Sequence, residues 1–430
     1  MFTNKCRSGL LGFAVLCAIL GISLGDTVPE LPTTSPWYGN EEIRIFREYL
    51  RYPTVHPNIN YEPCVEFLKR QAAGLGLPVS VVYPVNAQNP VVVITWQGSQ
   101  PDLPSIMLNS HTDVVPVFEQ FWTHPPFAAD VDETGRIYAR GTQDTKGLGM
   151  IHLAAIRALK RNGVQLKRTI HVTFTPDEEL GGFNGMAGFV ASNEFKALNV
   201  GYALDEGGVS PTNTIGVFYD ERCPWQIEFI CNGPTGHASL LFEGTAGEKI
   251  TYLMDKFMKM RKDEVKKSKK GVAAGKVTSI NLTVLKGGVQ ANVVPPELRA
   301  IFDVRLGVDV DHAAFERQIN KWCKEAGGNI TINYLIKTPK APASRTDSTN
   351  PMWAVIETTA KEFNITVVPS ILVGATDMRF LRRENIPGFG FSPIINTPLL
   401  VHDNNEFVTA DAYLAAINFF TKVLTNLGKI

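Results

Sequence analysis

Stretches of apolar and β-branched residues repeatedly end in short acidic or histidine-bearing segments, and this repetition restricts the fold more than any other feature. Residues 106–108, 169–175 and 202–204 have the composition of buried strands, and each stretch leads into a polar loop. A helical pattern over 145–161 ends at Gly163. Strand, polar loop and helix in succession are typical of a mostly parallel sheet with helices on its faces. We therefore predict an α/β fold.

A different pattern begins near residue 218. Residues 225–231 alternate in polarity like a half-exposed strand, and a long charged helix is expected over about 248–270. Because 430 residues exceed one ordinary core, two domains are expected. The predicted boundaries are 1–25 for a signal peptide, 26–217 and 337–430 for the two parts of the main domain, and 218–336 for an inserted α+β sandwich.

The charges of the chain balance. There are 42 Lys and Arg residues against 42 Asp and Glu residues, so the formal net charge is +0. A nucleic-acid or acidic-membrane partner would favour a basic excess. We therefore expect no nucleic acid among the partners of this protein.

The N-terminus has the pattern of a secretory signal peptide. Lys5 and Arg7 precede an apolar block over 9–24, and small residues follow up to Gly25. A membrane anchor is the rival interpretation, but the block is short for a spanning helix. We expect cleavage after Gly25, a secreted protein, and no membrane association once the signal has been removed.

The cysteines that remain after such cleavage are too few and too scattered for a disulfide scaffold. They are Cys64, Cys223, Cys231 and Cys323, and no two have Cys-x-x-Cys spacing, which argues against thiolate zinc sites. A single bridge between Cys223 and Cys231 across a hairpin is a further possibility.

His111 and Asp113 stand at the end of the first buried stretch. Side chains two residues apart on an extended chain point the same way, so this pair would emerge side by side where the strand opens into a loop. In open α/β sheets that strand end is the usual ligand position. A carboxylate beside a metal-bound imidazole can hold the ring. The alternative is a strand-end histidine followed by an Asx turn.

Further acidic and imidazole groups follow at the ends of other elements. Asp144 precedes the helix over 145–161 and is either its N-cap or a carboxylate able to bridge two cations. Glu178 and Glu179 are adjacent, so their side chains diverge and one can bind metal while the other faces water. Such acidic pairs are usually only solvated. The same strand-end placement recurs in Asp205-Glu206, and His402 lies in a polar loop before the last helix. Five of the eight histidines, namely His56, His124, His152, His171 and His312, have ordinary explanations, although the aromatic loop of His124 could line a pocket.

Five ordered motifs make the chain resemble a known family. They are Ser110-His111-Thr112-Asp113, Gly141-Thr142-Gln143-Asp144-Thr145-Lys146-Gly147, Pro176-Asp177-Glu178-Glu179-x-Gly181-Gly182, Leu204-Asp205-Glu206-Gly207 and Gly236-His237-Ala238-Ser239. In this order they resemble the co-catalytic di-zinc amidohydrolases and peptidases, and most closely the N-acyl-L-amino-acid amidohydrolases (aminoacylases). The resemblance covers nearly everything after residue 36. It implies a di-zinc exopeptidase-like fold with an inserted lid and dimerisation domain.

The resemblance also implies two zinc ions per chain. His111, Asp144 and Glu206 would bind one zinc, and Asp144, Glu179 and His402 the other, with Asp144 bridging. Asp205 is the alternative ligand if the wrong member of its pair has been assigned. Nitrogen and oxygen ligands of this kind leave coordination positions open for water and substrate. Glu178 would be the general base, and Asp113 would orient His111.

The oxyanion-binding and substrate-binding residues come from the same resemblance. His237 would steady the oxyanion in an active site, either its own or that of a partner subunit. Asn292, Arg305 and Thr376 would bind the substrate, since arginine can bind a free α-carboxylate with two parallel hydrogen bonds. The alternative for Arg305 is an ion pair with Asp303.

The resulting expectation is an enzyme that hydrolyses the amide bond of small N-acyl-L-amino acids, as a homodimer formed through the inserted domain. A secreted dipeptidase or carboxypeptidase on the same scaffold is the nearest alternative. A secreted binding protein without catalysis is the rival from another class, and it predicts a missing ligand or base. The best-known aminoacylases are cytosolic, so the signal peptide suggests that the natural substrate differs.

Overall fold

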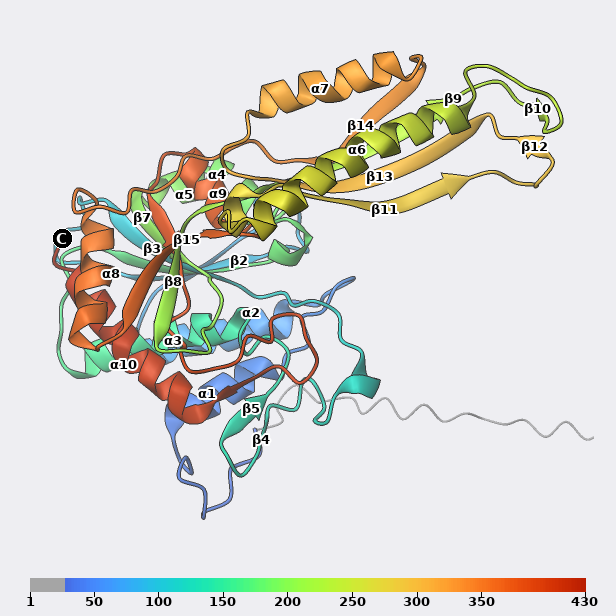
Figure 1. The fold of residues 1–430 in the computed structure, drawn as a ribbon. Coiled ribbons are helices and arrows are strands. Elements are labelled where there is room, and N and C mark those ends of the chain that lie inside the picture. Colours follow the sequence, from blue (N-terminus) through green and yellow to red (C-terminus); the bar gives the residue numbers. More distant parts are fainter. Residues whose placement is uncertain (1–27) are drawn as a thin grey trace, which may run out of the picture.

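A computed structural model describes residues 28–430, so the predicted signal peptide over 1–25 lies outside the described residues. Its large sheet has eight strands (Figure 1). Their order across the sheet is β1 (Val79–Val82), β2 (Val91–Trp96), β6 (Ile170–Thr175), β3 (Ser105–His111), β7 (Val200–Asp205), β16 (Gly388–Gly390), β8 (Thr214–Glu221) and β15 (Thr366–Leu372). Strands β6, β3, β7 and β16 are parallel, as are β8 and β15. Strand β1 pairs antiparallel with β2, and so do β2 with β6 and β16 with β8.

Helices cover both faces of this sheet, as predicted. One face packs against α1 (Glu41–Leu50), α2 (Glu62–Leu75), α3 (Lys146–Arg161), α8 (Pro351–Glu362) and α10 (Ala410–Leu427). The other face packs against α4 (Met186–Ala191), α5 (Asn193–Ala197) and α9 (Met378–Arg383). Alternating residues of β2 show the two faces, because Val92 and Ile94 enter the first core and Val91 and Val93 the second. The main body is therefore a three-layer α/β sandwich.

A second, smaller unit projects from this body (Figure 1). Its antiparallel sheet has the order β11 (Ser279–Gly287), β13 (Glu297–Leu306), β9 (Cys223–Asn232) and β14 (Ile330–Lys337). Helices α6 (Ala246–Lys269) and α7 (His312–Glu325) pack on one face of it. The two-residue strands β10 (Gly236–His237) and β12 (Val293–Val294) pair at its outer end. We call this unit, residues 223–337, the lid.

The strand before the lid runs further than the sequence predicted. Strand β8 continues to Glu221 within the large sheet, past the predicted boundary at 217, because its pairing with β15 extends to Leu372. The chain then crosses into β9 at Cys223. At the far end of the lid, β14 ends at Lys337, one residue beyond the predicted 336.

Several element ends follow directly from local chemistry. The side chain of Asn40 accepts hydrogen bonds from the backbone N–H groups of Glu42 and Ile43 and so caps α1. Helix α2 ends at Gly76, whose φ of 61° lies in the left-handed region that favours glycine. Thr245 and Glu248 form a reciprocal capping box at the start of α6. Among the described residues, no helix is both long and apolar enough to cross a bilayer.

The suggested Cys223–Cys231 bridge is wrong. Both residues lie on the single strand β9, so about 26 Å of extended chain separates them. Within the described residues, Cys64, Cys223, Cys231 and Cys323 are all buried free thiols.

Candidate metal and active site

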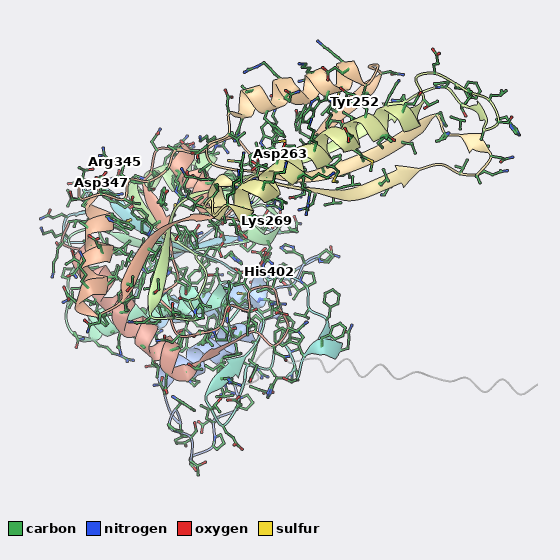
Figure 2. The ribbon with its side chains drawn as sticks, in the orientation of Figure 1. Tyr252, Asp263, Lys269, Arg345, Asp347 and His402 are labelled. Atoms are coloured by element: carbon green, nitrogen blue, oxygen red, sulfur yellow. The ribbon has the colours of Figure 1, made fainter. Side chains whose placement is uncertain are left out.

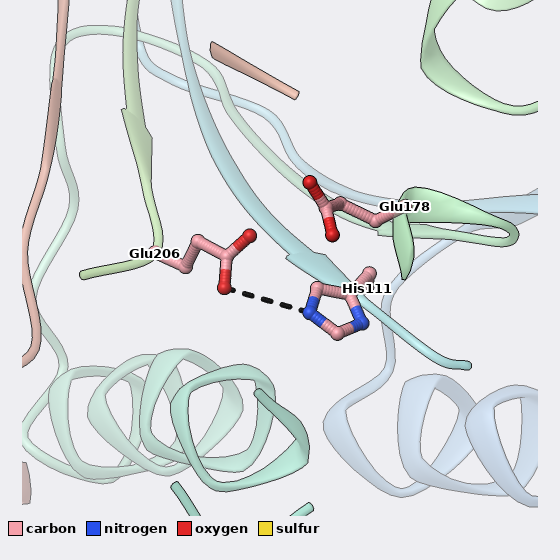
Figure 3. Close-up of side chains that lie close together, drawn as sticks. All are labelled: His111, Glu178 and Glu206. Atoms are coloured by element: carbon pink, nitrogen blue, oxygen red, sulfur yellow. Dashed lines mark ion pairs between the residues drawn. The ribbon is translucent and has the colours of Figure 1, made fainter. Parts of the chain in front are cut away.

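The candidate site lies at one edge of the large sheet, where three neighbouring parallel strands end. Strand β3 ends at His111, strand β7 ends at Asp205 just before Glu206, and strand β6 leads into the short helix η2 (Glu178–Leu180). Because parallel strands present their carboxyl ends at the same edge, residues nearly 100 positions apart meet there. Figure 3 shows His111, Glu178 and Glu206 together.

Asp144 lies between the two histidines. Its Oδ1 is 3.0 Å from Nε2 of His111, and its Oδ2 is 2.9 Å from Nε2 of His402. Thr145, and not Asp144, stands at the N-cap position of α3, and it makes no capping hydrogen bond through its side chain. The interpretation of Asp144 as an ordinary helix cap therefore fails, because both of its oxygens face imidazoles.

Each histidine has a second carboxylate beside it. Oε2 of Glu206 is 3.5 Å from Nε2 of His111, and Oε1 of Glu179 is 3.2 Å from Nε2 of His402. Asp205 contacts a different residue, because its Oδ1 accepts a hydrogen bond from Nδ2 of Asn109 at 3.0 Å. The geometry thus favours Glu206 over Asp205 as the partner of His111.

The gathering of carboxylates changes the ionisation of the histidines. Hydrogen bonds to Asp144 and Glu179 raise the pKa of His402 to about 10. Burial alone would lower the pKa of His111, but the charge of Glu206 and hydrogen bonds to Asp113 and Asp144 raise it well above its usual value. Both shifts favour the positively charged imidazolium form in the metal-free chain, and this charge would partly offset the negative charge of the surrounding carboxylates.

Glu178 projects into the same cluster. Burial, and after it the negative charge of Glu206, raise the pKa of Glu178 well above its usual value. Nη1 of Arg379 lies 3.9 Å from Oε1 of Glu178, and the Arg379 guanidinium is anchored by hydrogen bonds to the carbonyl oxygens of Thr376 and Gly181. Burial makes the ionised form of Glu178 costly, whereas cations bound beside it would favour that form. A carboxyl group balanced in this way can both accept a proton and return it.

Asp113 supports this cluster from behind. Nδ1 of His111 donates to the main-chain carbonyl of Asp113 at 2.8 Å, while the Asp113 carboxylate is 3.5 Å away. The backbone carbonyl is thus the closer partner of the ring, whereas the carboxylate was expected to orient it. Burial would raise the pKa of Asp113, but hydrogen bonds with His111 and His56 lower it to about 2.

Buried groups that sequence patterns did not reveal hold the loop before Asp144. Glu406 is fully buried and accepts hydrogen bonds from Nη1 of Arg140 at 2.7 Å and from the backbone N–H of Gln143 at 2.7 Å. Its position in the polar segment after His402 suggested only a solvated loop. His56, which had an ordinary explanation, contacts Asp113, and no sequence spacing indicated that contact.

The donor set fits two divalent cations. Ligand atoms of His111, Asp144 and Glu179 lie within 4.8 Å of one another, and so do those of His111, Glu178 and Glu206. Two imidazoles and several carboxylates without a thiolate suit zinc that keeps open positions. Burial, and after it repulsion from neighbouring carboxylates, raise the pKa of Glu206 well above its usual value. Bound cations would offset this repulsion.

His237 and the predicted substrate-binding residues do not join this cluster within one chain. His237 and Asn292 lie near the β10–β12 pair, at the outer end of the lid in Figure 1, whereas Figure 2 places His402 on the main body below the lid. Arg305 donates two hydrogen bonds to Asp303, at 2.8 and 3.1 Å, which is the alternative stated for it. Thr376 is buried, and its hydroxyl donates to Oε2 of Glu221 at 3.2 Å.

Comparison with known proteins agrees with the resemblance read from the motifs. Residues 107–426 match the sequence model of Peptidase family M20/M25/M40. Aminoacylase-1 of Mus musculus is 43% identical over 402 residues, which cover 93% of this chain and 98% of that protein. A metallo-carboxypeptidase of the M20 family from Sulfolobus solfataricus superposes with a TM-score of 0.70 at 19% identity, covering 90% of this chain and 99% of that chain. A dinuclear metal-binding M20 peptidase from Bacillus subtilis does so with a TM-score of 0.63 at 17% identity, covering 90% and 97%.

Proposed function

The chain belongs to peptidase family M20/M25/M40 and is a hydrolase that acts on amides, and from that premise we propose that it hydrolyses N-acyl-L-amino acids in a zinc-dependent reaction. One observation carries the proposal: Asp144 presents one carboxylate oxygen to each of two histidines, with Glu178 in the same cluster. The identity to Aminoacylase-1 of Mus musculus favours an N-acyl-amino acid over a peptide as substrate.

We assign the ligands as follows. His111, Asp144 and Glu206 would hold one zinc ion, and Asp144, Glu179 and His402 the second. The short distances from Asp144 to both imidazoles support its bridging role. When bound, the zinc pair supplies a Lewis acid and makes a nucleophilic water available at neutral pH.

Glu178 is the general base and general acid in this scheme. It accepts the proton of the attacking water and returns that proton to the leaving amine, so that a neutral amine departs. The Arg379 guanidinium, 3.9 Å away, limits how far the Glu178 carboxylate can turn from the cluster. Asp113 keeps η2 in place, because its carboxylate accepts the backbone N–H groups of Glu178 and Glu179.

The lid would complete the site from a second chain. His237 is proposed to donate a hydrogen bond to the developing oxyanion, and its place at the outer end of the lid suits a role in the active site of a partner subunit. We therefore propose a homodimer that associates through the lid. Asn292, Arg305 and Thr376 stay proposed substrate-binding residues. Arg305 would have to exchange its contact with Asp303 for the substrate carboxylate.

Secretion is proposed from the N-terminal sequence pattern alone. Expression of the full chain in a eukaryotic host, followed by N-terminal sequencing of the protein in the medium, tests this proposal. A mature protein beginning at Asp26 is the expected result, and retention of the intact chain in the cell would contradict it.

The decisive experiment compares substrates on zinc-loaded protein. Hydrolysis of N-acetyl-methionine well above that of a panel of dipeptides supports the aminoacylase assignment, whereas the reverse order supports a dipeptidase or carboxypeptidase on the same scaffold. Metal analysis is done in parallel, with two zinc ions per chain expected. Fewer than two ions together with no hydrolysis would favour a binding protein without catalysis.

A further inference from the structure

The carboxylate of Asp113 contacts segments of the candidate site that are far apart in the sequence. It is fully buried, at 0% exposure, and its Oδ2 lies 2.8 Å from Nε2 of His56. The same Oδ2 accepts the backbone N–H of Glu179 at 3.1 Å, and Oδ1 accepts that of Glu178 at 3.2 Å. His56 is the one side chain in this group that the proposed mechanism does not use.

The segment carrying His56 is held firmly against the end of β3. Val55 forms a parallel bridge with Val114, and the carbonyl of Thr54 accepts the N–H of Val114 at 2.9 Å. The hydroxyl of Thr54 donates to the carbonyl of Thr112 at 2.5 Å. These contacts hold residues 54 and 55 against residues 112 and 114, which adjoin His56 and Asp113 in the sequence. The imidazole of His56 therefore contacts Asp113 from a constrained backbone position.

We propose that His56 is a positioning residue, which holds the Asp113 carboxylate between His111 and the first turn of η2. The proposal rests on the proposed function, in which Glu178 is the base and Glu179 and His111 are ligands. With its proton on Nε2, His56 donates to Oδ2 and leaves Oδ1 free to accept the N–H of Glu178.

The physical reason lies in the limited number of donors around a buried carboxylate. Asp113 has the His56 imidazole, two backbone N–H groups and the more distant Nδ1 of His111 around it. Removing the His56 donor leaves Oδ2 with only the backbone N–H of Glu179, so the buried charge loses its shortest hydrogen bond, which favours rotation of the carboxylate toward other partners. Rotation of Asp113 would shift η2, and with it Glu178 and Glu179, because their N–H groups follow the carboxylate.

The test compares two substitutions of His56. His56→Phe keeps a planar ring but removes the donor, whereas His56→Gln keeps an N–H at about the position of Nε2. We expect His56→Phe to weaken zinc binding and lower kcat by about 10- to 100-fold, as for other partners of metal ligands. KM should change little, and His56→Gln should restore both quantities. Zinc affinity is measured by competition with a chromogenic chelator.

His312→Phe is the matched control. The ring of His312 packs against Trp225 within the lid, at 5.3 Å between ring centroids, so this substitution also replaces an imidazole by a phenyl ring but outside the main body that carries Asp113. We expect wild-type zinc affinity and kcat for this variant. The thermal unfolding of the metal-free proteins is measured beside these values, because a purely structural role of His56 would appear there.

Two outcomes would overturn the proposal. In the first, His56→Phe retains wild-type zinc affinity and kcat. In the second, the unfolding midpoint of metal-free His56→Phe falls and His56→Gln restores neither zinc affinity nor kcat. Failure of the proposed function is distinguishable, because it appears as wild-type protein that does not cleave N-acyl-amino acids, while the zinc-affinity comparison still reports on His56.

Discussion

At the residue scale, the site depends on which neighbouring group each oxygen of a carboxylate contacts. Asp144 directs one oxygen to each histidine, whereas Asp113 directs both toward donors that do not bind metal. Adjacent residues differ just as sharply, since Glu206 faces His111 while Asp205 accepts from Asn109. The residue type alone therefore does not determine what a carboxylate does at this site, and each proposed role has to be tested by its own substitution.

Glu178→Gln separates the base from the ligands. Because the amide cannot accept the proton of water, kcat should fall by at least about 10²-fold, while zinc content stays at the wild-type value. The matched control is Glu179→Gln, which should lower zinc content. Kinetics with N-acetyl-methionine and metal analysis check both variants. Loss of zinc from Glu178→Gln would instead make Glu178 a ligand.

His152 predicts a pH dependence of stability. It is buried in α3, packs against Phe420 at 4.7 Å between ring centroids, and burial lowers its pKa to about 3. The unfolded chain, with a histidine pKa of about 6.5, binds this proton and the folded chain does not, so stability is lost as pH falls from about 6.5 to 3. Relative to His152→Leu, wild type should lose about 2 kcal/mol between pH 7.5 and 5.0. Urea unfolding at both pH values measures this difference, and equal losses in the two proteins would contradict the prediction.

At the element scale, segments beside the candidate site carry three of the four phenylalanines that are exposed among the described residues. Among the described residues the exposed phenylalanines are Phe118 at 62%, Phe121 at 61%, Phe183 at 50% and Phe363 at 39%. Phe183 follows η2, and the 118–121 segment is tied to the His402 loop because Nδ2 of Asn405 donates to the carbonyl of Phe121 and its Oδ1 accepts the N–H of Thr123. Three of the four thus belong to segments next to the proposed metal ligands.

These phenylalanines predict a preference for large apolar acyl groups. Contact with an aromatic side chain is worth about 1.5–3 kcal/mol when it is fully buried, so loss of one should cost roughly tenfold in kcat/KM. We expect Phe183→Ser to lower kcat/KM for N-octanoyl-methionine about tenfold relative to N-acetyl-methionine. Phe363→Ser, whose ring packs on Phe419, is the control and should not change the ratio. An unchanged ratio in Phe183→Ser would exclude contact with the acyl chain.

At the scale of the whole molecule, the lid extends away from the main body, and β10, which contains His237, lies at its outer end, away from the large sheet that carries the proposed metal ligands (Figure 1). Leu240, Leu241 and Val289 are exposed at the same end, at 57%, 103% and 93%. An isolated chain would leave both the proposed oxyanion donor and this apolar surface without a partner. A two-fold dimer would give each site the tip of the other lid.

Mixed dimers test this arrangement. Glu178→Gln and His237→Ala chains are co-expressed with different tags, each variant being nearly inactive alone, with His237→Ala reduced by about 10²- to 10³-fold. If His237 acts on the partner, the mixed dimer has one intact site, and random pairing should restore about a quarter of wild-type activity. Activity no higher than the sum of the two separate variants would show that His237 does not act across subunits.

Much of the architecture could be predicted from local patterns. The helices over 146–161 and 246–269 and the strand over 170–175 begin and end within a residue or two of the predicted bounds, because caps, glycines and apolar periodicity act over a few residues. The short strands β16 and β17 (Phe407–Thr409) and the short helices α4, α5 and α9 escaped prediction. Elements of three to six residues owe their form to neighbours in the fold rather than to their own sequence.

The sequence by itself determined the α/β class, the inserted lid, and the set of acidic and imidazole groups that meet at the sheet edge. Those groups follow strand ends, and parallel strands bring their ends together. Only the tertiary structure decided that Glu206 faces His111, that Glu406 and His56 support the cluster, and that Arg305 pairs with Asp303. Such choices depend on which atoms lie within about 3 Å after folding, and hydrogen bonds and ion pairs lose their energy over distances that sequence spacing cannot resolve.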